Sequence, residues 1–224
     1  FGLPETLPVA RRSKGGLGSF RSTFKVLLKD KAFMGYGLVQ GLIGGALFAY
    51  ISGSPFVIQK VFGASPQMYS LIFAVNSAGI VLATQITGRL AGRVEEKSLF
   101  VAGVSLACCG VLFLLTAVLT GMGLYAVLVG LFMVVSSVGV VTTTGFSLAM
   151  ENQGEAAGSA AAIQGVLGFL FGGLAAPLVG LGGESTALPL SIVIAGLCLG
   201  AVLCYLFLIR PVTGKIDLSW EGKQ

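Results

Sequence analysis

Residues Ser98–Met150 read SLFVAGVSLACCGVLFLLTAVLTGMGLYAVLVGLFMVVSSVGVVTTTGFSLAM and contain no charged side chain. A transmembrane helix needs roughly 20 apolar residues to cross about 30 Å of hydrocarbon, so this stretch is long enough for two. Two glycines interrupt it at Thr120–Gly123, where we place a tight turn. The stretch therefore predicts two membrane-spanning helices joined by that turn.

The rest of the chain has the same character. Of its 224 residues 55% are hydrophobic and only 10% are charged, whereas soluble domains carry about 25% charged residues. Further charge-free stretches cover residues 32–59, 61–88, 156–183 and 185–209. These stretches are continuous rather than alternating, which excludes the strands of a membrane β-barrel. We predict an all-α membrane protein with six transmembrane helices, at residues 32–54, 67–88, 98–119, 124–150, 156–182 and 186–209.

The boundaries of these spans carry recognisable signals. Ser65 directly precedes Pro66, which predicts an N-cap side chain followed by a proline at the first helical position of the second span. Pro177 falls inside the fifth span, where we expect it to kink the helix and free a carbonyl group.

The basic residues predict the orientation in the membrane. Of the 14 Lys and Arg residues, all but Lys60 fall before the first span, between the second and third, or after the sixth. Cytoplasmic loops are enriched in Lys and Arg, so we expect both termini to be cytoplasmic. The chain then divides into a leading segment 1–31, a six-helix domain 32–209 and a cytoplasmic tail 210–224.

The leading segment has distinct parts. We interpret its first residues as the end of a preceding helix, and residues 11–19, RRSKGGLGS, as a flexible basic linker. Residues 20–33, FRSTFKVLLKDKAF, place apolar side chains at helical spacing with basic residues on the other face. This pattern is typical of a short interfacial helix on an anionic cytoplasmic leaflet. A disordered linker with chance spacing is the alternative. The apolar positions are Phe20, Phe24, Leu27 and Leu28.

Several motifs resemble the second half of a major facilitator superfamily transporter. Pro4–Pro8 (PETLP) resembles a sequence that follows the sixth helix of drug-efflux members. Thr87–Leu99 (TGRLAGRVEEKSL) is similar to the superfamily loop pattern G-x-L-A-D-R-x-G-R-K. Glu155–Gln164 (EAAGSAAAIQ) resembles the entry to the eleventh helix of bicyclomycin/chloramphenicol-resistance (Bcr/CflA-type) antiporters. Gly53–Val57 with Phe62–Pro66 resembles the periplasmic hairpin of that group.

The resemblance implies a fold and a function. The chain would be helices 7–12 of a multidrug:proton antiporter of the bacterial inner membrane, built as a 3+3 inverted repeat. The transporter would export small, mostly neutral or amphipathic drugs by alternating access coupled to proton influx. The predicted spans contain no charged residue or histidine, so the proton-coupling carboxylate would lie in the missing N-terminal half. The expected partners are that half, the drug, the proton and membrane lipid, with no cofactor and no nucleic acid.

Uncharged polar and aromatic side chains recur on the spans that, by the resemblance, border a central cavity. Amides can hydrogen-bond a neutral drug, and aromatic rings can stack on it. The alternative is that such side chains join neighbouring helices, a contribution of about 0.6 kcal/mol on average. The candidate substrate-binding residues are Tyr36, Gln40, Tyr69, Phe73, Asn76, Phe146, Gln164 and Phe171.

The loop between the second and third spans holds a candidate cytoplasmic gate. Relatives pair loop arginines with a glutamate after the tenth helix when the cytoplasmic face closes, so the resemblance implies an Arg93–Glu151 contact in an outward-facing form. Gly92 replaces the acid of the family pattern, which weakens this interaction. Charges that only set the topology are the alternative. We expect Gly88 and Gly92 to permit the tight turn of this loop. The candidate gate residues are Gly88, Arg89, Arg93, Glu151 and Glu155.

Other classes of membrane protein fit poorly. The chain has no histidine, which excludes the serine–histidine pair of a rhomboid-type protease and argues against a metal site. Gly88–Arg93 lacks the lysine–serine pair of a phosphate loop. The remaining alternative is a non-transporting six-helix membrane module, monomeric or dimeric, that has no activity alone.

Overall fold

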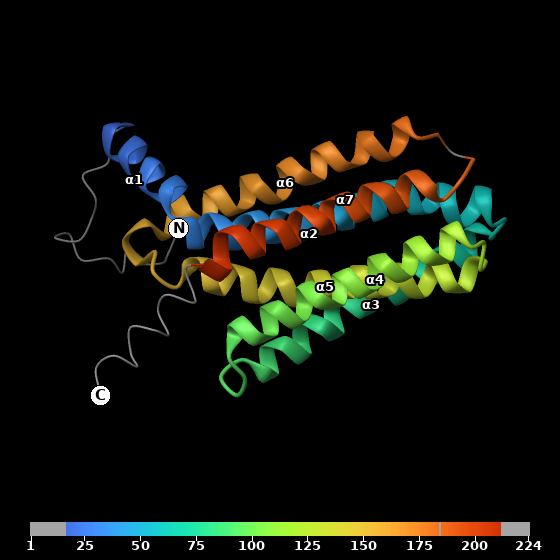
Figure 1. Cartoon of the computed structure of the whole chain (residues 1–224), viewed down its shortest axis with the longest axis horizontal. Coiled ribbons are helices and arrows are strands. Elements are labelled where there is room, and N and C mark those ends of the chain that lie inside the picture. The colour runs from blue at the N-terminus through green and yellow to red at the C-terminus, as the bar shows by residue number, and fades with distance from the viewer. Residues whose placement is uncertain (1–16, 184, 212–224) are drawn as a thin grey trace, which may run out of the picture.

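The computed structural model describes residues 17–183 and 185–211, where the secondary structure is helical apart from turns and one isolated bridge between Ala91 and Val94. The PETLP motif and most of the predicted tail lie outside these residues. Six long helices run side by side, with a shorter one at one end (Figure 1). The α-helices are α1 (Leu17–Lys29), α2 (Lys31–Pro55), α3 (Pro66–Leu90), α4 (Glu96–Leu119), α5 (Leu124–Met150), α6 (Ala157–Leu181) and α7 (Leu188–Cys204).

The six predicted spans are confirmed as α2 to α7, each long and apolar enough to cross a membrane. The largest difference is at the end of the first, which continues through Pro55 into a π-helical segment, Phe56–Val61. A proline lacks the N–H that would continue the α-helical ladder, and here the chain widens into a π turn instead of stopping. A second π-helical segment, Tyr205–Ile209, extends α7. Pro177 lies inside α6, which is assigned without a break across it.

Two local predictions from the sequence are confirmed. The Ser65 hydroxyl accepts a hydrogen bond from the Met68 N–H at 3.2 Å, and Pro66 opens α3. Between α4 and α5 the chain turns at Gly121 and Gly123, with φ of +67° and +86°. These left-handed backbone angles carry little cost for glycine, which explains why the uncharged stretch breaks there.

A helix does form in the segment where we predict an interfacial helix, but with other boundaries. α1 ends at Lys29, and Asp30 is the N-cap of α2: its Oδ1 accepts hydrogen bonds from the Ala32 and Phe33 N–H groups at 3.0 and 3.1 Å. The sequence analysis was therefore wrong to extend one helix to residue 33. Leu27 is buried whereas Leu28 is half exposed, so the predicted apolar positions do not all pack against the bundle. The Phe20 side chain lies outside the described residues.

The contacts between the six spans have an internal symmetry. The same contact pattern results when α2 is exchanged with α5, α3 with α6 and α4 with α7. α2 packs on α6 as α5 packs on α3, and α4 packs on α5 as α7 packs on α2. The pairs α2–α5 and α4–α7 meet at the centre. Because the exchanged helices run in opposite directions, the six-helix bundle is an inverted repeat of three-helix units, as we predict from the sequence.

Glycines let several helices of the bundle approach closely. A Cβ atom at Gly139 on α5 would lie 2.5 Å from the Ile80 carbonyl oxygen of α3. One at Gly130 would lie 2.8 Å from the Leu114 Cα atom of α4. Small residues at such contacts are typical of membrane helices, where close van der Waals packing drives association.

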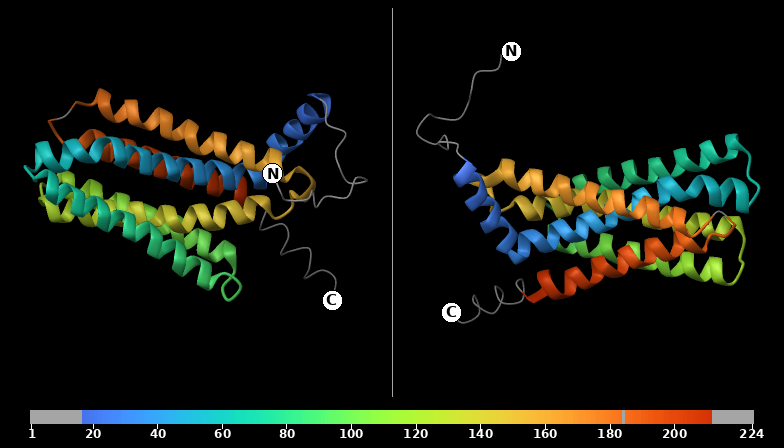
Figure 2. Two further views of the ribbon diagram at one scale, coloured as in Figure 1. Left: turned by 180° about the vertical axis from the view of Figure 1, so that it is seen from behind. Right: turned by 90° about the horizontal axis from the view of Figure 1, so that it is seen from above.

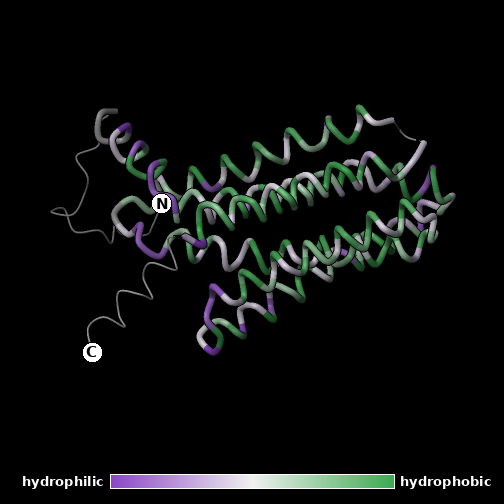
Figure 3. The backbone as a smooth tube through the Cα atoms, viewed as in Figure 1, coloured by the Kyte–Doolittle hydropathy of each residue, from purple (hydrophilic) through white to green (hydrophobic). Residues whose placement is uncertain are grey.

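We call the end of the bundle that holds α1, residues 91–95 and residues 151–156 the basic end. Hydrophilic residues concentrate there and at the opposite turns, while the spans are apolar (Figure 3). α1 crosses the basic end at a steep angle to the spans and contacts α2 and α6 (Figure 2).

Candidate functional site

A groove runs between α5 and α6, with α2 as its floor. α2 packs on both helices, whereas α5 and α6 scarcely touch, and this separation leaves a cavity of about 380 Å³. Its lining is largely apolar, with aromatic rings and two glutamine amides. Phe48 and Phe169 meet across α2 and α6 with ring centroids 6.1 Å apart. The lining residues are Gln40, Gly44, Leu47, Phe48, Val138, Thr142, Phe146, Ala161, Gln164, Gly165, Gly168 and Phe169.

The Gln164 amide is the most unusual group of the groove. Its side chain is only 3% exposed, and neither Oε1 nor Nε2 has a hydrogen-bond partner. Room for this amide comes from Gly37 of α2, where a Cβ would lie 3.0 Å from Oε1 and 3.1 Å from Nε2. An unpaired buried polar group costs about 1–3 kcal/mol, so such groups in native proteins generally meet water or a ligand.

Two further polar groups line the groove. The Gln40 Oε1 atom is buried and has no hydrogen-bond partner either. The Thr142 hydroxyl, by contrast, donates to the Val138 carbonyl oxygen of its own helix at 2.7 Å. Two of the residues that line the groove therefore carry amide groups with unpartnered atoms, which are buried in this conformation, on an otherwise apolar surface.

Three lining positions are glycines that face open space. Cβ atoms built at Gly44, Gly165 and Gly168 would meet nothing within 4 Å outside their own helix. These glycines differ from Gly139, whose missing side chain is needed for helix contact. Their absent side chains add to the volume of the groove.

The structure brings three of the predicted substrate residues together in this groove: Gln40, Phe146 and Gln164. Asn76 is buried elsewhere, on α3, where its Nδ2 donates to the Ile72 carbonyl oxygen and its Oδ1 has no partner. Tyr36 faces α4, with its ring 5.1 Å from that of Phe100 in an edge-on arrangement. Neither lines the groove.

Tyr69 and Phe73 lie in an aromatic cluster near the end opposite the basic end. The rings of Phe73 and Tyr50 stack with centroids 5.9 Å apart, and the Tyr69 hydroxyl lies 3.3 Å from the Ser54 hydroxyl. This cluster joins α2 to α3 and does not reach the groove.

Phe171 packs against α2 at Gly41. A Cβ atom at Gly41 would lie only 2.9 Å from the Phe171 Cδ2 atom. The sequence analysis missed Phe169 and Phe48. Helical spacing identified residues that share a face with Gln164, but not which edge of that face meets the groove. In α6 that edge carries Ala161, Gly165 and Phe169.

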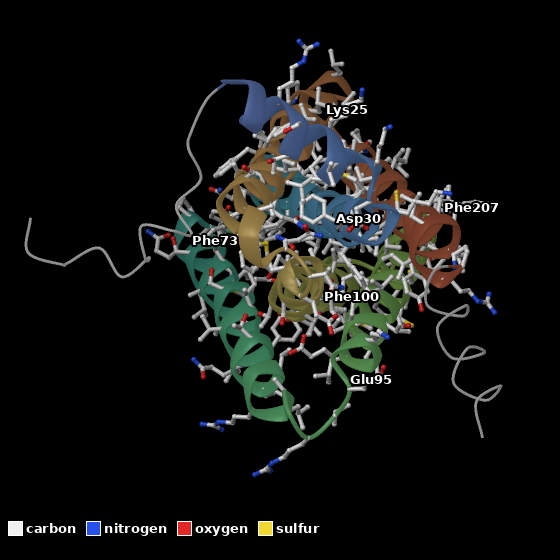
Figure 4. The ribbon with its side chains drawn as sticks, turned by 90° about the vertical axis from the view of Figure 1, so that its left-hand side faces the viewer. Lys25, Asp30, Phe73, Glu95, Phe100 and Phe207 are labelled. Carbon is white, nitrogen blue, oxygen red and sulfur yellow. The ribbon has the colours of Figure 1, made fainter. Side chains whose placement is uncertain are left out.

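No hydrogen bond or ion pair joins the candidate gate residues whose side chains the structure describes. Gly88 lies inside α3, so it is Gly92, with φ of +85°, that makes the turn, and the sequence analysis was wrong to place Gly88 there. Arg89 and Arg93 form no ion pair with Glu151 within residues 17–183 and 185–211. The side chain of Glu155 lies outside the described residues. The 91–95 turn lies on the far side of the basic end from α1, as Glu95 and Lys25 show in Figure 4.

Six helices long and apolar enough to span a membrane, packed as an inverted repeat with a groove between α5 and α6, are typical of a membrane transport protein. Residues 1–177 match the Major Facilitator Superfamily, and the chain belongs to that family, whose members are transporters rather than enzymes.

The chain is also similar to two curated proteins. The chain is 42% identical over 188 residues to the Bacillus subtilis "Uncharacterized MFS-type transporter YdgK". The matched residues cover 84% of this chain and 46% of that protein. It is 23% identical over 208 residues to the Haemophilus influenzae "Bicyclomycin resistance protein homolog", covering 93% of this chain and 52% of that protein. The chain thus spans about half the length of the curated relatives it matches.

Proposed function

We propose that this chain is the C-terminal half of a secondary active multidrug efflux transporter. It exports small, mostly neutral or amphipathic drugs by alternating access coupled to proton influx across the bacterial inner membrane. The observation that carries the proposal is the unpaired Gln164 amide, buried at 3% exposure in a groove with aromatic walls. A neutral drug with hydrogen-bonding groups and an apolar body matches that lining.

The chemistry of the spans supports the division of roles between the two halves. Residues 32–59, 61–88, 98–150, 156–183 and 185–209 carry no charged side chain or histidine. A proton-coupled cycle needs a titrating group in the pathway, so we place the coupling carboxylate in the missing N-terminal half, with this half supplying neutral contacts to the drug. The name of the Haemophilus relative supports drug export as the activity.

Gln164→Leu in the full-length transporter tests the substrate assignment. We expect a loss of about fivefold or more in drug affinity, since a hydrogen bond contributes about 1 kcal/mol. The measurement is drug resistance of a host that lacks its own exporters, together with drug-driven proton movement in inverted membrane vesicles. Gln67→Leu, the same change at an exposed position near the start of α3, is the matched control. Unchanged resistance to every neutral drug at equal expression would contradict the assignment.

The alternative is a six-helix membrane module that does not transport alone. The coding sequence that precedes Phe1 discriminates the two. Six further apolar spans with an acidic residue in the first support the transporter, whereas a stop codon directly upstream favours the module.

A further inference from the structure

α1 is held firmly against the basic end of the bundle. Leu27 is 1% exposed and belongs to the hydrophobic core, and Phe24 packs against that core while half-buried. α1 contacts both α2 and α6 and crosses the basic end at a steep angle to the spans (Figure 2). Its outer surface therefore has a fixed orientation relative to the spans.

The outer surface of α1 carries a stripe of cations. Arg21, Lys25 and Lys29 recur at four-residue steps, so they share one side of the helix, and all three are exposed. Together with Phe24 and Leu28 they line an open surface along this side of α1. We call this surface the α1 groove, and it combines three cations with two apolar side chains.

No carboxylate neutralises these cations in the part of the chain that the structure describes. The acid next to the stripe, Asp30, is fully engaged: Oδ1 accepts from two backbone N–H groups of α2, and Oδ2 accepts from Gln153 Nε2 at 3.1 Å. Arg21, Lys25 and Lys29 form no ion pair within residues 17–183 and 185–211. Among the described residues, the three positive charges are therefore left without a carboxylate counterion.

The α1 groove lies beside the start of a membrane span, at the level where lipid headgroups are expected. Lys29 is separated from Lys31, the first residue of a membrane span, by Asp30 alone, so the stripe begins where the apolar layer ends. We propose that the α1 groove binds the phosphodiester headgroup of an anionic phospholipid. The cations contact the phosphate, and Phe24 and Leu28 contact the glycerol and the upper acyl chain. Charge-assisted hydrogen bonds to phosphate are among the stronger ones in proteins.

The test compares two variants that remove the same charge from opposite sides of the basic end. Arg21→Gln/Lys25→Gln/Lys29→Gln removes the stripe, and Arg89→Gln/Arg93→Gln/Lys97→Gln removes three cations around the α3–α4 turn. The full chain in detergent is incubated with phosphatidylglycerol or phosphatidylcholine, and retained lipid is counted by native mass spectrometry. Each Lys or Arg near an anionic lipid surface raises the binding affinity about fivefold. We expect wild type to prefer phosphatidylglycerol, the stripe variant to lose about 10- to 100-fold of that affinity, and the turn variant to keep it.

Four results would overturn the proposal. Equal loss in both variants would show a response to net charge alone. Equal retention of the two lipids by wild type would show no recognition of the anion. Displacement of the lipid by millimolar inorganic phosphate would identify a site for free phosphate instead. The charge-conserving variant Arg21→Lys/Lys25→Arg/Lys29→Arg, with the thermal midpoint as a check on folding, should retain the lipid, and its failure to do so would also contradict the proposal.

Discussion

Gln153 and Asp30 are 123 residues apart in the sequence, yet the Gln153 Nε2 group donates a hydrogen bond to Asp30 Oδ2 at 3.1 Å. The same carboxylate caps α2 through its other oxygen. One side chain therefore joins the end of α1, the start of α2 and the connection between α5 and α6. Figure 4 shows Asp30 near the middle of the basic end.

Asp30→Ala should lower the free energy of unfolding by about 1–2 kcal/mol, because it removes the N-cap of α2 and leaves Gln153 without its acceptor. Asp30→Asn keeps a good capping oxygen, so its effect should be smaller. The measurement is the thermal midpoint of the detergent-solubilised chain. If Gln153→Ala destabilises as much as Asp30→Ala, the cap is not the main contribution.

Gln164→Leu should stabilise the protein while it impairs export. The substitution removes two unpaired polar atoms from a buried site, which we expect to raise the free energy of unfolding by about 1 kcal/mol. Thermal unfolding and transport are measured on the same preparation. A fall in stability would show that the amide has a structural partner, and would count against its role in binding a ligand.

Gly139→Ala should destabilise the bundle by about 1–3 kcal/mol, because the added Cβ would lie 2.5 Å from the Ile80 carbonyl oxygen and force α5 away from α3. Gly44→Ala is the matched control on α2, since its Cβ would meet nothing within 4 Å outside its own helix. We expect the control to keep or raise the thermal midpoint. Equal effects of the two substitutions would contradict the close α3–α5 contact.

Cysteines at positions 93 and 151 should report on the proposed gate. Arg93 and Glu151 form no ion pair in the conformation described here, and we predict that they meet when the cytoplasmic face closes. In a full-length transporter without its native cysteines, Arg93→Cys/Glu151→Cys should form a disulfide in the outward-facing form and stay reduced in the inward-facing form. Lys97→Cys with Glu151→Cys is the control pair. Crosslinking that does not depend on conformation would argue for charges that set topology alone.

The spans were predictable because a helix that crosses the lipid hydrocarbon needs about 20 residues without charge, and such stretches are visible in the sequence. The Ser65 cap and the glycine turn at Gly121 were predictable for a related reason, since each depends on a single local interaction. Asp30 carried a signal that was missed: an acid directly before a long apolar helix favours an N-cap. The basic and apolar pattern of α1 continues past it and concealed the boundary.

The groove was harder to predict because it depends on which helices meet. Gln40, Phe146 and Gln164 were recognised as polar or aromatic residues in apolar spans, and they do converge. Tyr36 and Phe171 have the same appearance in the sequence but pack against α4 and α2. Periodicity gives the residues that share a helix face. The rotation of that face within the bundle depends on contacts such as those at Gly37 and Gly41, which belong to tertiary structure.

The open glycines at Gly44, Gly165 and Gly168 have a consequence for how the groove can evolve. Replacing such a glycine by alanine narrows the groove and at the same time favours the helix by up to about 1 kcal/mol. Most mutations that alter specificity reduce stability, which limits how many can accumulate. At these three positions a lineage can change which ligands fit the groove without that loss, so we expect them to vary first among relatives that bind different ligands.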